Sequence, residues 1–160
     1  MTPAMDQASA PSAARLMTVL GVLGLVPFII PPLLRPEIFE PQLSWSSLQA
    51  VYAAVILAFL GGARAAQAAF SASVDPRALI ISMIPPLAGF ALASSAFAVQ
   101  SAPAETARVL LCLALAMALQ GAWDITAEAL PPWYRRLRLP LTVTACLALV
   151  AGAALAGWRA

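Results

Sequence analysis

The residues of this sequence that could do chemistry are charged side chains placed inside long apolar segments. Arg64 lies near the C-terminal end of one such segment, and Asp124 lies near the end of another. Glu128 follows Asp124 by four residues, which places the two carboxylates on one face of a helix. Ionisable groups at membrane depth are costly and commonly functional. We therefore take Arg64, Asp124 and Glu128 as a candidate polar site.

The pair of Arg64 and Asp124 has two interpretations. As an ion pair, it would join two helix ends and lower the cost of removing each charge from water. It would then be a packing clamp. As a polar site, it would bind an anion, a lipid head group or a partner protein. The residues by themselves leave both interpretations open.

Residues suited to catalysis or metal binding are scarce in this chain. It has no His, and all nine of its basic residues are Arg, so the usual general base and the commonest metal ligand are missing. Cys112 and Cys146 fall on different predicted helices, about 15 Å apart along the membrane normal at 1.5 Å of rise per residue. That distance is too long for a disulfide. We expect no catalytic residues, no cofactor and no metal site, and a protein that is not an enzyme.

A cluster of aromatic residues and arginines precedes the last apolar segment. Aromatic rings lie at head-group level and arginines attract anionic lipid, so such a cluster anchors a helix at the cytoplasmic surface. The alternative is a docking surface for another protein. The members of the cluster are Trp133, Tyr134, Arg135, Arg136 and Arg138.

The composition indicates the environment of these side chains. Of the 160 residues, 62% are hydrophobic and 10% are charged, whereas soluble domains have about 45–50% apolar and about 25% charged residues. So few charged groups cannot cover a soluble domain, and so many apolar residues exclude a disordered chain. A net charge of +2 without a basic face excludes a nucleic-acid partner. The expected partner of the chain's surface is the lipid bilayer.

The positions of the charges divide the chain into five apolar segments, each long enough to cross a bilayer. We predict an all-α integral membrane bundle of five transmembrane helices. Residues 1–15 form a flexible cytoplasmic tail, and residues 16–160 form a single membrane domain. A loop over 32–44 lies on the membrane surface, and a short interfacial segment precedes the last helix. The predicted spans are 16–34, 47–70, 77–100, 104–128 and 140–158.

Prolines and small residues predict how these helices are shaped and packed. Pro85 and Pro86 fall near the middle of the third span, where they remove backbone hydrogen bonds and kink the helix. Because freed carbonyls need partners in lipid, the kink should face other helices. The alternatives to such a packing kink are a hinge and a break in the helix that lines a ligand site. Small residues four apart predict a close-packed face, within one bundle or in a homo-oligomer: Ala54, Ala58 and Gly62.

The distribution of the arginines predicts the orientation in the membrane. Six of them fall in the N-terminal tail and the second and fourth loops, and three fall in the other loops and the C-terminus. Cytoplasmic loops carry the excess of positive charge. We therefore expect a bacterial inner-membrane protein with a cytoplasmic N-terminus and a periplasmic C-terminus.

Two sequence strings resemble the transmembrane-protein-69-like family. They are YAAVILAFLGGAR at residues 52–64 and WYRRLRLPLT at residues 133–142. The resemblance takes in Gly21, Gly24, Pro27 and the pair Trp123-Asp124, and it covers roughly residues 16–158. That family is a domain of unknown function found in bacterial and mitochondrial inner membranes. The resemblance implies a small multi-pass inner-membrane protein without an assigned activity.

Two functions are compatible with these residues. The first is a non-enzymatic accessory or assembly protein that docks another membrane protein through its arginine-rich cytoplasmic face. The second is a bundle that binds or transports a small ligand, a lipid or an ion. Its polar site would lie near Arg64, Asp124 and the Pro85-Pro86 kink.

Overall fold

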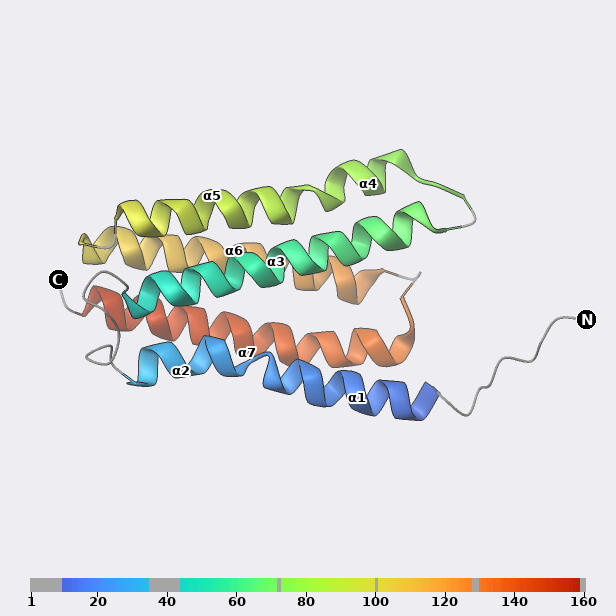
Figure 1. The fold of residues 1–160 in the computed structure, drawn as a ribbon, viewed down its shortest axis with the longest axis horizontal. Coiled ribbons are helices and arrows are strands. Elements are labelled where there is room, and N and C mark those ends of the chain that lie inside the picture. The colour runs from blue at the N-terminus through green and yellow to red at the C-terminus, as the bar shows by residue number, and fades with distance from the viewer. Residues whose placement is uncertain (1–9, 35–43, 72, 100, 128–129, 159–160) are drawn as a thin grey trace, which may run out of the picture.

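The fold is a bundle of helices that run along one common axis (Figure 1). The computed structural model describes residues 10–34, 44–71, 73–99, 101–127 and 130–158, and these contain helices and no strand. Five stretches are long and apolar enough to cross a bilayer. The predicted all-α membrane bundle is confirmed. The helices are α1 (Ala10–Leu23), α2 (Val26–Leu34), α3 (Trp45–Ala69), α4 (Pro76–Ser82), α5 (Ile84–Ala98), α6 (Pro103–Thr126) and α7 (Pro132–Gly157).

Several helix boundaries differ from the prediction. The last helix begins at Pro132 rather than at 140, so the residues of the predicted interfacial segment are helical and form the first turns of α7. Proline is favoured in a first helical turn, and Pro140 within α7 removes a single backbone hydrogen bond without ending the helix. At the N-terminus, residues 10–15 belong to α1 and not to the tail. Residues 1–9, and residues 35–43 of the predicted surface loop, lie outside the described residues.

The predicted kink in the third span is present. The span is divided at Met83 into α4 and α5, and Pro85 and Pro86 occupy the first turn of α5. Pro86 has no N–H to donate to the carbonyl of Ser82, which lies four residues earlier. Gly61 of α3 packs directly on this point: a Cβ added to Gly61 would lie 2.6 Å from both the Ser82 carbonyl oxygen and Pro86 Cδ. The kink therefore faces another helix, as expected for lipid surroundings.

The first span is also broken, and α3 supplies donors to it. The span consists of α1 and α2, separated at Gly24 and Leu25. The Tyr52 hydroxyl donates a hydrogen bond of 2.8 Å to the carbonyl of Gly24. Gln49 Nε2 donates a hydrogen bond of 2.9 Å to the carbonyl of Phe28. In a regular helix that carbonyl would accept from the N–H of residue 32, but residue 32 is proline and has no N–H. Polar side chains of α3 therefore satisfy carbonyls that the break and the prolines leave open.

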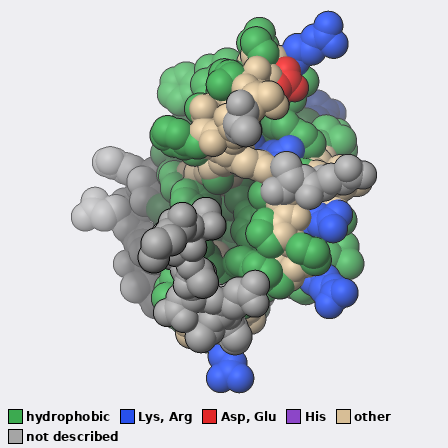
Figure 2. Space-filling view, turned by 90° about the vertical axis from the view of Figure 1, so that its right-hand side faces the viewer, with side chains coloured by type: hydrophobic (Ala, Val, Ile, Leu, Met, Phe, Trp, Pro, Cys, Tyr) green, Lys and Arg blue, Asp and Glu red, His purple; other side chains and the backbone are tan. Residues whose placement is uncertain are grey.

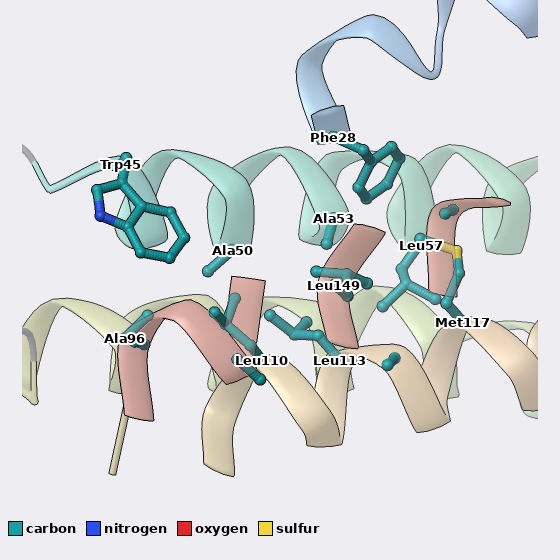
Figure 3. Packing of buried hydrophobic residues seen from close by; sticks show 14 of the residues in the cluster. Phe28, Trp45, Ala50, Ala53, Leu57, Ala96, Leu110, Leu113, Met117 and Leu149 are labelled. Carbon is teal, nitrogen blue, oxygen red and sulfur yellow. The ribbon is translucent and has the colours of Figure 1, made fainter. Parts of the chain in front are cut away.

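The apolar core lies where α3, α6 and α7 meet, and Figure 3 shows its central side chains. The packing face of α3 differs from the predicted stripe. Ala54 does lie against Gly89 of α5, but Ala58 and Gly62 are exposed, and a Cβ on Gly62 would meet nothing within 4 Å. In a helix of 3.6 residues per turn, each residue of a stripe with a spacing of four is rotated by about 40° from the one before it. The stripe therefore leaves the buried face within a few steps. The buried face instead follows Ala50, Ala53, Leu57, Leu60 and Gly61.

Candidate functional site

Three charged side chains from three different helices meet inside the bundle. Asp124 of α6 is 1% exposed. Its Oδ2 accepts a hydrogen bond of 2.9 Å from Nε of Arg138 in α7. Its Oδ1 lies 3.8 Å from Nε of Arg64 in α3. The structure therefore brings Arg64 to Asp124 but makes Arg138 the closer partner.

Neutral side chains complete the surroundings of this triad. Gln120 lies one turn before Asp124 and donates a hydrogen bond of 3.1 Å to Asp124 Oδ1. Arg64 Nη1 donates to Gln67 Oε1 at 2.7 Å. The guanidinium carbon of Arg64 lies 4.3 Å from the centroid of the Trp123 ring, a cation–π geometry. These contacts hold Arg64 between α3 and α6.

Helical spacing explains why these side chains point inward. On α6, the buried residues Met117, Gln120, Gly121 and Asp124 recur every three or four positions. On α7, Arg138 lies one turn before Thr142, which is also buried. Gly121 lets the two helices approach each other closely, because a Cβ there would lie 2.5 Å from Thr142 Oγ1. Arg138 is thereby brought within reach of Asp124.

The described residues of the site carry one positive charge in excess. They hold two guanidinium groups against one carboxylate. Arg138 is 8% exposed, and neither its Nη2 nor Oγ1 of the equally buried Thr142 has a hydrogen-bond partner among the described residues. Buried polar atoms are nearly always paired, so each such atom calls for an explanation.

A cavity of about 370 Å³ adjoins the triad. It lies between the first span, α3 and α7, and apolar side chains dominate its wall. Three polar residues of α7 contribute to the lining: Tyr134, Arg138 and Thr142. The apolar residues include Met17, Leu20, Phe28, Ile56, Leu60 and Leu141.

The remaining residues singled out from the sequence have different positions. Arg138 was predicted to be an anchor or docking residue, and this is wrong because the helix turns it inward to Asp124. Trp133 and Arg136 are exposed, while Tyr134 and Arg135 are half-buried. Figure 2 shows arginine side chains around an apolar surface at the end of the bundle that includes the α3–α4 and α6–α7 connections. Glu128 lies outside the described residues.

Sequence reasoning missed Gln120, Gln49 and Tyr52. The sequence did contain a signal for Gln120, because this residue precedes Asp124 by four positions in an apolar helix and so lies on the same helix face. Gln49 and Tyr52 are isolated polar groups in the apolar segment of α3. Nothing local shows that the carbonyls they serve, those of Phe28 and Gly24, lie opposite them.

The site and its cavity fall within a region shared with known proteins. The family model described as "Protein of unknown function (DUF3429)" matches residues 13–154. The chain belongs to this family. Transmembrane protein 69 of Xenopus tropicalis is 35% identical to it over 137 residues, which are 82% of this chain and 51% of that relative. The chain thus spans about half the length of this curated family relative, and no solved structure matches it. The resemblance to the transmembrane-protein-69-like family is confirmed.

Proposed function

We propose that this protein is a non-catalytic integral membrane protein that binds a small apolar or amphipathic molecule taken from the bilayer. The observation that carries the proposal is the cavity of about 370 Å³ between the first span, α3 and α7. Ligand sites in proteins commonly have volumes of about 300–1,000 Å³ and apolar walls with a few polar groups. An apolar cavity of about 150 Å³ already binds benzene. A hydrocarbon ligand would therefore gain contacts along most of this wall.

The sparse packing of the first span supports entry from the lipid side. Only 6% of an 18-residue stretch of this span is buried in the bundle, against 44% for α3. Its N-terminal helix α1 packs chiefly on α7. The approach of α1 to α7 centres on Gly21, where an added Cβ would lie 2.7 Å from Leu141 Cδ1. Such a wall can move with little loss of packing.

Filling the cavity is expected to reduce binding. Leu20 lines the cavity and is 53% exposed, while its neighbour Val19 is 56% exposed and does not contribute to the lining. We expect the Leu20→Trp variant in neutral-lipid nanodiscs to lose at least about fivefold of its crosslinking to dodecanol bearing a diazirine. The larger side chain would occupy volume that the alkyl chain needs. Mass spectrometry of the crosslinked peptides measures both yield and position.

The Val19→Trp variant is the matched control and should crosslink like the unmodified protein. In that protein the labels should concentrate on Met17 and Ile56, which line the cavity. Equal labelling of Leu147, an exposed residue of α7 that does not line the cavity, would contradict the proposal. So would equal yields from the two tryptophan variants.

Docking of a partner, the other function predicted from the sequence, has less support. The proposal depended on the cluster of three arginines, and Arg138 is engaged with Asp124. Trp133 and Arg136 remain exposed at the start of α7 and are the residues that such a partner, or a second copy of the chain, would contact. We therefore place ligand binding before an accessory or assembly role.

The proposed location is the bacterial inner membrane, with the N-terminus in the cytoplasm. The arginine excess at the end of the bundle that holds Arg64, Arg77 and Arg136 supports this orientation. We expect alkaline phosphatase, which is active only in the periplasm, to be active when fused after residue 160 and inactive when fused after Ser73. The opposite pattern would show that the orientation is wrong.

A further inference from the structure

We propose that α1 is a gate, which turns about the break at Gly24 and Leu25 and opens the cavity sideways to the bilayer. This inference rests on the proposed function, because it concerns how a molecule from the bilayer reaches the cavity. In this movement α2 stays fixed on α3, while α1 swings away from α3. The molecule then passes between α1 and α3.

The exposure of the lining residues shows where the cavity meets the lipid. Met17 and Leu20 of α1 are 52% and 53% exposed, and Phe59 of α3 is 68% exposed, although all three line the cavity. Met117 of α6 and Ala145 of α7 also line it and are buried. The cavity is therefore closed on the side of the core. Because α1 packs chiefly on α7, the exposed edge lies between α1 and α3, and we call this edge the mouth.

The second half of the first span, α2, is firmly attached to its neighbours. Phe28 is 2% exposed and belongs to the core, and its ring meets the Tyr52 ring edge-on at 4.9 Å between centroids. Gln49 Nε2 donates hydrogen bonds to the carbonyl of Phe28 at 2.9 Å and to the carbonyl of Ala148 in α7 at 3.0 Å. One amide group thus joins α2, α3 and α7. Movement of α2 would break these contacts inside an apolar core.

The first half of the span, α1, is attached much less. None of its side chains whose burial is described is buried. The Thr18 hydroxyl donates its hydrogen bond to the carbonyl of Ala14 within α1 itself. The close approach to α7 at Gly21 lies only three residues before the break, next to the pivot. The more distant turns of α1 can therefore move while that contact changes little.

The backbone between the two halves has lost helical hydrogen bonds that would stiffen it (Figure 1). The N–H of Leu25 donates to the carbonyl of Val22, and the N–H of Phe28 donates to the carbonyl of Leu25, both at 3.0 Å. Each bond spans three residues instead of the four of an α-helix. Pro27 has no N–H, so the carbonyl of Leu23 lacks its helical donor. A few such residues are sufficient for a hinge.

Pulsed electron paramagnetic resonance tests the movement of α1 without a ligand. Spin labels are placed at Val19 of α1 or at Ile30 of α2, each paired with a label at Leu115 of α6, and all three positions are exposed. The chain is studied in nanodiscs with both native cysteines replaced by serine. We expect the distance distribution of the Val19 pair to be at least about twice as wide as that of the Ile30 pair, because only α1 turns about the hinge.

A proline variant connects this width to the break. Pro27→Ala restores an N–H that can donate to the carbonyl of Leu23, and it should narrow the distribution of the Val19 pair. Pro31→Ala, which lies within α2 beyond the break, is the matched control and should leave that distribution unchanged. A Val19 distribution as narrow as that of Ile30, or one that stays equally wide in Pro27→Ala, would overturn the hinge.

A crosslink across the mouth tests the passage itself. Leu20→Cys and Phe59→Cys in the same cysteine-free background are joined by a short bismaleimide. When they are joined before the diazirine-bearing dodecanol is added, labelling of Met17 and Ile56 should fall at least about fivefold, because the gate cannot open. The reference is the same variant treated with N-ethylmaleimide, which modifies both cysteines without joining them. When dodecanol is added first, the crosslinked protein should label like this reference.

The outcomes separate this inference from the proposed function. Full labelling of the protein that was crosslinked first would overturn the gate and leave cavity binding intact. Equal losses for both orders of addition would also overturn it, because a closed gate retains what it encloses. Absence of labelling at Met17 and Ile56 in the unmodified protein would overturn the proposed function, whereas the widths of the two distance distributions would still decide whether α1 turns about the hinge.

Discussion

Replacement of Asp124 with Ala is expected to destabilise the bundle by about 3–5 kcal/mol, the cost of removing one partner from a buried ion pair. The substitution leaves Arg138 and Arg64, whose side chains are 9% and 12% exposed, without a carboxylate among the described residues. It also removes the acceptor of the hydrogen bond from Gln120. The free energy of unfolding, measured by denaturant titration in mixed micelles, checks the prediction.

Asp75 provides the control for this experiment. It is an exposed carboxylate that caps α4 by accepting a hydrogen bond of 2.9 Å from the N–H of Arg77. Its replacement with Ala should cost about 1 kcal/mol, as for other helix N-caps. A variant that combines Asp124→Leu with Arg138→Met should recover part of the loss, because apolar side chains can replace a buried ion pair. A loss below about 1 kcal/mol for Asp124→Ala would show that the triad does not hold the helices together.

Alanine substitutions at Gly61 and Gly62 are expected to change stability in opposite directions. A Cβ at Gly61 would lie 2.6 Å from the Ser82 carbonyl oxygen, a backbone atom that cannot move without shifting the kink. We expect a loss of about 1–3 kcal/mol, as for other over-packed sites. A Cβ at Gly62 meets nothing within 4 Å. Alanine there should stabilise α3 by about 0.5–1 kcal/mol, because glycine is the poorer helix former.

The same unfolding titration measures both glycine variants, and each serves as the control for the other. Equal effects at the two positions would mean that α3 does not contact the kink through Gly61. The experiment also distinguishes the two packing faces directly, because Gly62 belongs to the predicted stripe and Gly61 belongs to the observed face.

Much of the candidate site was accessible from the sequence, and the omissions have a common cause. Arg64 and Asp124 stood out because charged groups are rare in apolar segments, and the structure brings them together at 3.8 Å. Arg138 was assigned to the membrane surface because its neighbours in the chain are aromatic and basic. Whether it points inward depends on where α7 begins and on which side α6 lies, and neither is a local property.

Gln49 and Tyr52 show the same limit in a different way. The sequence indicates that prolines leave carbonyls without helical donors, and that lipid makes partners for them necessary. It does not indicate which distant side chain supplies each partner. The donors to Phe28 and Gly24 come from α3, and residues 35–43, which lie outside the described residues, separate α3 from the first span in the sequence.

By itself, the sequence determined the membrane environment, the five spans and the kink at Pro85 and Pro86. These features depend on transfer free energies and backbone hydrogen bonds, which act within a few residues of one another. Only the tertiary structure decided that Gly61 rather than Gly62 packs, that Arg138 joins Asp124, and that a cavity lies beside them. The physical reason is that both the lipid-facing and the inward-facing sides of a membrane helix are apolar. Hydropathy therefore does not mark the buried face, and the positions of the neighbouring helices select it.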